Sequence, residues 1–141
     1  MTDSRSDTVS LAREASCSCG QLRVDVSGPV KRVSICHCLA CQRRTGSPFG
    51  QQARFDADSV EVHGRATEYV RHSDEDGEAR IYRFCPECGS TVFYTFERSP
   101  ELVAIPVGAF ADPSFPPPTR SVYGTRKHEW IALPDAIRAY D

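Results

Sequence analysis

The sequence contains no long apolar segment and no strong excess of charge. No stretch of its 141 residues approaches the roughly 18–20 consecutive apolar residues that are needed to span a bilayer. Residues 1–7 are polar and do not resemble a secretory signal, so we expect the chain to remain in the cytoplasm. The formal net charge is −2, and the basic residues form only short runs, which gives no phosphate-binding surface. We therefore predict neither a membrane nor a nucleic acid as a partner.

Sustained helical periodicity is also missing. Short segments rich in β-branched and aromatic residues are separated by Gly, Pro, Asp and Ser, a pattern typical of strands and turns. Strands are expected at residues 21–26, 31–35, 59–63, 67–71, 80–84, 91–96 and 102–107. Short helices are expected at residues 38–45 and 134–139, and the proline-rich residues 112–118 predict an extended connector. The predicted fold class is mostly β, with short helical turns.

The length of the chain suits one domain, because single domains commonly contain about 100–150 residues. Residues 1–14 are polar and aperiodic, and we interpret them as an N-terminal tail or a first strand. Too few residues follow the proline-rich connector to build a second core. We therefore expect one domain over residues 15–141.

Cysteine is the most informative residue type in the chain. The seven cysteines form a first pair (Cys17 and Cys19), a triplet (Cys36, Cys38 and Cys41) and a last pair (Cys85 and Cys88). An odd number cannot all pair in disulfides, and thiols in the cytoplasm stay reduced. Clustered thiols of this kind bind Zn²⁺, which takes four ligands in a tetrahedron. We therefore interpret the cysteines as zinc ligands.

The last pair belongs to a Cys-Pro-Glu-Cys-Gly turn, which is a typical zinc half-site and needs a partner. One arrangement joins it to Cys38 and Cys41, but this leaves Cys17, Cys19 and Cys36 unexplained. The other joins it to the first pair in a closed four-cysteine site and leaves the triplet together. Three protein ligands with an open position are typical of catalytic zinc, whereas four indicate structural zinc. The second arrangement uses every cysteine and is preferred for that reason.

Spacing alone is also compatible with cysteines that are all structural, without an open zinc. His37 lies between Cys36 and Cys38, so alternation directs its side chain away from a metal that both neighbours bind. We expect it to be packed or solvent-facing. The remaining histidines stand alone in the sequence and are expected at the surface: His63, His72 and His128.

The cysteine motifs are similar to those of a known family. The patterns Cys-x-Cys-Gly, Cys-His-Cys-x-x-Cys-Gln-Arg and Phe-Cys-x-x-Cys-Gly-Ser occur in this order at residues 17–20, 36–43 and 84–90. Further matching positions are Gly46 and residues 107–113, 121–130 and 133–135. Together they resemble the glutathione-dependent formaldehyde-activating enzyme family, which includes centromere protein V.

This resemblance implies an Mss4-like zinc-binding β-sheet fold with two zinc ions per chain. The first and last pairs match the family's structural zinc site, and the triplet matches its catalytic zinc site. The namesake enzyme joins glutathione and formaldehyde into S-(hydroxymethyl)glutathione, so the implied class is a carbon–sulfur lyase. The implied partners are a small thiol such as glutathione and a small aldehyde.

Two classes of function follow from these patterns. The first is a zinc-dependent enzyme that joins a thiol to an aldehyde, with Arg43 and Arg44 as the nearest basic groups for an anionic thiol. The same two arginines are equally well explained as exposed residues on a helix. The second class is a non-catalytic zinc-binding module that acts through protein contacts. Added thiol distinguishes the two, because an open zinc site binds thiols and a closed one does not.

Overall fold

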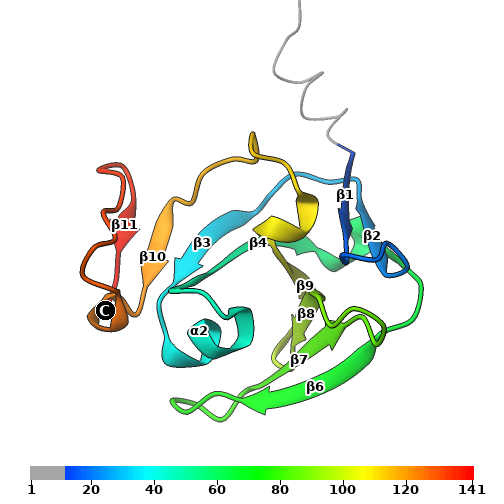
Figure 1. Ribbon diagram of the computed structural model, residues 1–141, viewed down its shortest axis with the longest axis horizontal. Coiled ribbons are helices and arrows are strands. Elements are labelled where there is room, and N and C mark those ends of the chain that lie inside the picture. The colour runs from blue at the N-terminus through cyan, green and yellow to red at the C-terminus, as the bar shows by residue number, and fades with distance from the viewer. Residues whose placement is uncertain (1–11) are drawn as a thin grey trace, which may run out of the picture.

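The computed structural model describes residues 12–141, which form two β-sheets and one short α-helix (Figure 1). In chain order the strands are β1 (Arg13–Ser16), β2 (Arg23–Val26), β3 (Arg32–Cys36), β4 (Gly50–Asp56), β5 (Val60–His63), β6 (Thr67–His72), β7 (Ala79–Phe84), β8 (Thr91–Phe96), β9 (Ser99–Pro106), β10 (Arg120–Val122) and β11 (Arg138–Ala139). The helix is α2 (Leu39–Thr45), and the 3₁₀ turns are η1 (Ala57–Ser59), η2 (Val107–Phe110) and η3 (Gly124–Arg126). The predicted mostly-β class is confirmed.

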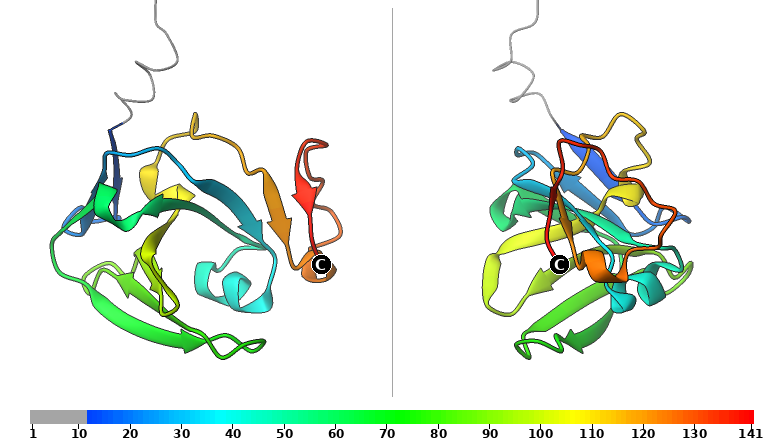
Figure 2. Two further views of the ribbon diagram at one scale, coloured as in Figure 1. Left: turned by 180° about the vertical axis from the view of Figure 1, so that it is seen from behind. Right: turned by 90° about the vertical axis from the view of Figure 1, so that its left-hand side faces the viewer.

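The larger sheet curls around α2. Its strand order is β11-β10-β3-β4-β9-β8-β7-β6, with β10 parallel to both of its neighbours and the other pairs antiparallel. Figures 1 and 2 show α2 inside the curve of this sheet. We call the sheet face that looks towards α2 the concave face. The three-stranded sheet, β1-β2-β5, shares a core with the opposite face.

Alternation along the strands separates the side chains of the larger sheet into two sets. The buried apolar set packs against the three-stranded sheet, and it includes Val33, Phe55, Val103 and Ile105. A smaller cluster lies on the concave face and contains Tyr82, Tyr94, Phe96 and Ala104. The concave face also carries polar residues, so this sheet has one apolar core face and one face suited to a binding site.

The ends of α2 are set by Cys38 and Gly46. The Cys41 backbone amide donates to Cys38 Sγ at 3.3 Å, which caps the N-terminus of the helix. Gly46 ends the helix with a φ of 67°, a left-handed conformation that glycine adopts without strain. Gly50 allows the helix to approach β4, because a Cβ there would lie 3.3 Å from the Cβ of Cys41. The helix therefore holds part of the triplet against the larger sheet.

Most of the expected elements are present. The strand expected at residues 91–96 matches β8, and the helix expected at residues 38–45 begins one residue later because Cys38 is its cap. The helix expected at residues 134–139 is wrong. There the Ile137 amide donates to Pro134 O at 3.1 Å in a single turn, and the chain then pairs with β10 as β11. β4 is not among the expected strands, because most of its residues are weak strand formers.

The expectation of a tail or first strand at residues 1–14 falls mainly on residues 1–11, which lie outside the described residues. The first described strand, β1, begins at Arg13. Residues 112–118 contain no helix or strand, as expected, and Phe115 stacks on Phe110 with ring centroids 4.8 Å apart. Among residues 12–141, no helix is both long and apolar enough to cross a membrane.

Candidate metal centres and the adjoining cavity

The first and last cysteine pairs meet in space, and we call them together the four-cysteine cluster. Their four sulfur atoms all lie within 4.8 Å of one another. Cys19 Sγ lies 3.6 Å from both Cys17 Sγ and Cys85 Sγ, although Cys19 and Cys85 are 66 residues apart in sequence. A tetrahedral zinc with bonds of about 2.3 Å separates its sulfur ligands by roughly 3.8 Å. All four thiols are free, so their spacing suits a metal and not a disulfide.

Two tight turns present the sulfur atoms of this cluster. Gly20 and Gly89 have φ values of 86° and 79°, which lets each turn close directly after its cysteine pair. Backbone amides then point at the sulfur atoms and donate hydrogen bonds to them. These bonds run from Leu22 N to Cys17 Sγ and from Glu87 N to Cys85 Sγ, both at 3.3 Å.

Gln21 lies beside the cluster and was not singled out by the sequence. Its Nε2 donates to Cys85 Sγ at 3.0 Å and to Arg65 O at 2.8 Å, while its Oε1 accepts from Arg65 N at 3.0 Å. Gly64 makes this contact possible, because a Cβ at that position would collide with the carbonyl oxygen of Gln21. Gln21 therefore connects the sulfur of Cys85 through hydrogen bonds to the backbone of Arg65, between β5 and β6.

The thiols of the cluster differ in acidity. Hydrogen bonds from the Ser90 side chain and backbone lower the pKa of Cys88 to about 5. The backbone amide of Gln21 lowers the pKa of Cys19, but burial and the neighbouring thiols outweigh it and raise that pKa to about 11. Cys88 therefore loses its proton more readily than Cys19, as happens when closely spaced thiols titrate together.

The triplet occupies the junction of β3 and α2. Cys36 is the last residue of β3, Cys38 caps α2, and Cys41 lies in the first turn of the helix. The three sulfur atoms lie within 4.8 Å of one another. Within residues 12–141, no His, Asp or Glu joins them as a fourth potential ligand. The geometry is therefore that of three donors from one short segment.

Hydrogen bonding concentrates negative charge on Cys38. The thiols of Cys36 and Cys41 and the Cys41 amide donate to its sulfur, and they lower the pKa of Cys38 to about 2. The bond with Cys38 raises the pKa of Cys36, and burial adds to that rise. One thiolate is thus stabilised by two neighbouring thiols, which is a suitable starting point for a cation that displaces their protons.

His37 points away from the triplet, as alternation predicts. Its side chain is fully buried, and Nε2 lies 3.0 Å from Ser121 Oγ in β10. Burial lowers the pKa of His37, and the nearby charges of Lys127 and His128 lower it further. A neutral, packed imidazole therefore joins the triplet segment to β10 and does not act as a ligand.

The triplet opens onto a cavity of about 980 Å³ between α2 and the concave face. The basic residues that line it are Arg43, Arg44, Arg54, Arg71, Arg80 and Arg126, and the acidic ones are Asp74 and Glu75. Arg71 pairs with Asp74, at 3.5 Å between Nη2 and Oδ2. The cavity therefore carries an excess of positive charge beside the three sulfur atoms, which attracts an anionic ligand.

Aromatic rings form part of the cavity wall. The Arg44 guanidinium lies 5.2 Å from the ring centroid of Tyr82 and 5.6 Å from that of Tyr94. Burial raises the pKa of both tyrosines, so their hydroxyls stay protonated. Tyr123, another wall residue, has a φ of 60°, a strained conformation of the kind that gathers at functional sites. Of the two arginines noted in the sequence, Arg44 is held by these rings, whereas Arg43 is exposed.

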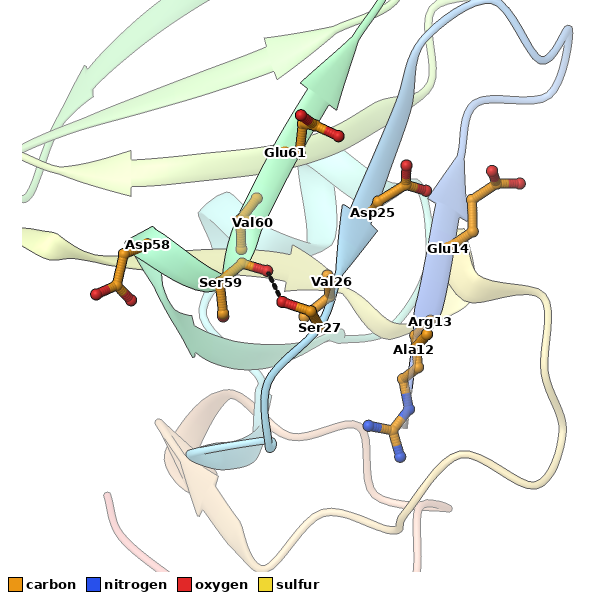
Figure 3. A pocket seen from close by; sticks show the side chains of 10 residues that line it. All are labelled: Ala12, Arg13, Glu14, Asp25, Val26, Ser27, Asp58, Ser59, Val60 and Glu61. Atoms are coloured by element: carbon orange, nitrogen blue, oxygen red, sulfur yellow. Dashed lines mark hydrogen bonds between the residues drawn. The ribbon is translucent and has the colours of Figure 1, made fainter. Parts of the chain in front are cut away.

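A separate pocket lies on the three-stranded sheet and shares no lining residue with this cavity (Figure 3). Glu14, Asp25 and Glu61 line it from three neighbouring strands. His63 Nε2 lies 3.0 Å from Asp25 Oδ2 and 3.1 Å from Glu61 Oε1. His63 therefore has carboxylate neighbours that the sequence did not reveal, and His128 instead contacts Gln42 Oε1 at 3.0 Å.

A family model described as glutathione-dependent formaldehyde-activating enzyme matches residues 12–126. The crystal structure of a Rhodobacter sphaeroides protein is similar to this chain with a TM-score of 0.54 and 20% identity, and the match covers 74% of this chain and 91% of that one. At this identity the likeness shows a shared fold alone. No curated protein matches the chain.

Proposed function

The chain belongs to the glutathione-dependent formaldehyde-activating enzyme family, and from this we propose that it joins a thiol to formaldehyde or another small aldehyde. The observation that carries the proposal is the triplet, in which three sulfur atoms face an arginine-lined cavity without a fourth protein donor among residues 12–141. The proposed reaction class is a carbon–sulfur lyase. The cytoplasm is the proposed compartment, because thiols stay reduced there.

We propose two zinc ions per chain, bound by one domain over residues 15–141. The four-cysteine cluster would hold a structural ion, because four protein ligands close the tetrahedron. The triplet would hold a catalytic ion, because three ligands leave one position open. Both donor sets consist of thiols whose sulfur atoms lie within 4.8 Å of one another, and thiolate ligands at this spacing suit zinc.

Bound zinc would lower the pKa of a thiol that enters its open position, so that the thiol ionises near neutral pH. In the proposed reaction the thiol sulfur bonds to the carbonyl carbon, and the thiol proton ends on the former carbonyl oxygen. A thiol RSH and formaldehyde thus give RS–CH₂OH, with no other reagent. Tyr82 lines the same cavity, and its hydroxyl, which burial keeps protonated, would serve as a hydrogen-bond donor to the developing oxyanion.

The cavity supports an anionic thiol such as glutathione as the cosubstrate. Its six arginines outnumber its two carboxylates, and one of those carboxylates is already paired with Arg71. A cleft lined by one sign of charge raises the local concentration of oppositely charged ligands. The tripeptide carries a net negative charge at neutral pH, whereas a simple thiol such as 2-mercaptoethanol is neutral.

Cobalt substitution tests the proposal. Each sulfur that joins Co²⁺ changes its thiolate charge-transfer bands, so glutathione should alter the spectrum of the triplet site. The response should strengthen as pH rises, because the incoming thiol must lose its proton. Formaldehyde added next should be consumed only when a thiol is present, which product analysis by NMR would measure.

Two outcomes would count against the proposal in different ways. A cobalt spectrum that no thiol changes would favour a closed, non-catalytic zinc-binding module that acts through protein contacts. A thiol response without aldehyde consumption would retain the open site but reject formaldehyde as the substrate. The Cys38→Ser variant serves as the control, because it removes one sulfur donor of the triplet and leaves the four-cysteine cluster intact.

A further inference from the structure

Arginines gather on the concave face in a way that the proposed chemistry does not require. Arg32 in β3 is paired with Arg54 in β4, and Arg120 in β10 is paired with Ser34 in β3. Residues opposite each other in a sheet share a face and have Cβ atoms about 5 Å apart. Alternate residues of one strand share a face as well, so Cys36 of the triplet lies on the same face as Ser34 and Arg32.

These three arginines have no acidic partner within residues 12–141. None of them occurs in an ion pair there. The Nε atoms of Arg32, Arg54 and Arg120 are buried without a hydrogen-bond acceptor in the described part of the chain. Burial and the charge of Arg32 lower the pKa of Arg54, while burial and the charge of Arg120 lower the pKa of Arg32. Mutual repulsion of this kind is relieved by an anion.

Aromatic rings hold two of the guanidinium groups in place. Arg54 lies 4.6 Å from the ring centroid of Phe96, and Arg120 lies 4.6 Å from that of Tyr140. A held guanidinium loses little entropy when it binds a carboxylate with two parallel hydrogen bonds. Within residues 12–141 Arg43 makes no such contact, and it is exposed on α2, so Arg54 is the better anchor for an anionic group.

Arg54 and the triplet line the same cavity. Cys36 and Arg32 are four positions apart on one strand, which corresponds to roughly 13 Å, and Arg54 lies opposite Arg32 on the next strand. Glutathione carries its sulfur on the central residue and a carboxylate at each end, roughly 7 Å away when extended. Together with the length of an arginine side chain, this reach can place the sulfur at the triplet and a carboxylate at Arg54. Gln52 lines the same cavity. Its buried Oε1 accepts no hydrogen bond within residues 12–141, and a peptide N–H of the ligand would supply one.

We propose that Arg54, flanked by Arg32 and Arg120, binds a carboxylate of the thiol substrate, so that the cavity selects a peptide-sized anionic thiol over a small neutral one. This inference rests on the proposed function, and it assigns Arg54 as the residue that determines thiol specificity. The arginines on α2 steer anions by charge, whereas Arg54 contacts the carboxylate directly.

S-Methylglutathione separates the carboxylate site from the metal, because its sulfur is capped and cannot ionise. Calorimetric titration into the zinc-loaded protein should show binding, and Arg54→Gln should weaken that binding at least about tenfold. Arg54→Lys should weaken it less, because lysine keeps the charge but not the paired hydrogen bonds. The control is Arg98→Gln, an exposed residue outside the cavity that pairs with Asp76 at 3.7 Å, and its affinity should equal that of the wild type.

The cobalt protein gives the second measurement. Glutathione should bind Arg54→Gln at least about tenfold more weakly than the wild type, whereas 2-mercaptoethanol and glutathione diethyl ester should bind both proteins equally. Thermal stability of Arg54→Gln should be unchanged or higher, because repulsion between the arginines falls, and this excludes misfolding as the cause of weaker binding.

Failure of S-methylglutathione to bind the wild type, or equal glutathione affinity in Arg54→Gln and Arg98→Gln, would overturn the inference. Failure of the proposed function looks different: no thiol changes the cobalt spectrum, while S-methylglutathione still binds through Arg54.

Discussion

The side-chain amide of Gln21 donates a hydrogen bond to the sulfur of Cys85, with Nε2 and Sγ 3.0 Å apart. The same amide group makes two hydrogen bonds with the backbone of Arg65, so its orientation is set by the turn that follows β5. Hydrogen bonds to a metal-binding thiolate hold the sulfur in position and balance its charge. Gln21 is therefore a positioning residue for the four-cysteine cluster, although it is not a ligand.

Gln21→Ala should weaken zinc binding at the four-cysteine cluster about tenfold and lower the free energy of unfolding by about 1–3 kcal/mol. The reason is that Cys85 Sγ and the Arg65 amide both lose their partner. Chelator competition measures the affinity, and thermal melts measure the stability. Gln51→Ala is the matched control, because the Gln51 side chain has no hydrogen bond within residues 12–141. Equal effects of the two substitutions would show that Gln21 does not support the site.

Freshly purified, reduced protein should contain two zinc ions per chain by elemental analysis. Cys17→Ser and Cys85→Ser should each lower Tm by more than about 10 °C, because the closed site joins distant segments and its metal binding contributes to folding. Cys38→Ser should lose one zinc ion with a much smaller change in Tm, since the triplet is local in sequence. A ratio of one zinc ion with three titratable thiols would contradict the division into four and three.

Gly64→Ala should destabilise the protein more than Gly77→Ala. Both glycines have positive φ values, 100° and 73°, so both substitutions cost about 1 kcal/mol of backbone strain. A Cβ at Gly64 would meet the carbonyl oxygen of Gln21, whereas a Cβ at Gly77 would have no atom of the described residues within 4 Å apart from its chain neighbours. Gly64→Ala should also weaken zinc binding, because it displaces the segment that orients Gln21. Chemical denaturation and chelator competition compare the pair, and equal losses in both would refute the steric argument.

The grouping of the cysteines was accessible from the sequence because each group is short. The triplet lies within six residues, so its three cysteines cannot lie far apart where a strand ends and a helix begins. The two remaining pairs supply four cysteines, the number that one structural zinc requires, so they were predicted to meet. The meeting of Cys19 with Cys85 over 66 residues followed only because zinc needs four ligands. The ligand roles themselves remain predictions, since spacing shows which sulfur atoms approach one another and not what they bind.

Other parts of the site carried no sequence signal. Gln21 follows a cysteine motif, but its role depends on a turn near Arg65 that only the tertiary structure brings close. Arg54 lies in β4, whose polar residues face a cavity, so the usual combination of β-branched and aromatic residues is weak there. The helix expected at residues 134–139 failed for a related reason, because parallel pairing with β10 overrode the local preference of the segment.

Cys38 has two roles that substitution can separate. Its sulfur caps α2 by accepting from the Cys41 amide at 3.3 Å, and it is also a proposed zinc ligand. Serine is a good helix cap but a poor zinc ligand, so Cys38→Ser should keep α2 while losing the triplet metal. Alanine provides neither function. Metal-free Cys38→Ala should therefore be less stable than metal-free Cys38→Ser by about 1 kcal/mol.

Both variants should lose the thiol response of the cobalt protein to the same extent, because each removes one of three sulfur donors. Chemical denaturation in the presence of a chelator measures the difference in stability, and cobalt spectra measure the loss at the metal. Equal stability of the two metal-free variants would show that the cap contributes nothing to α2. A thiol response that survives in Cys38→Ser would show that Cys36 and Cys41 hold the metal without it, and the proposed three-cysteine site would then be wrong.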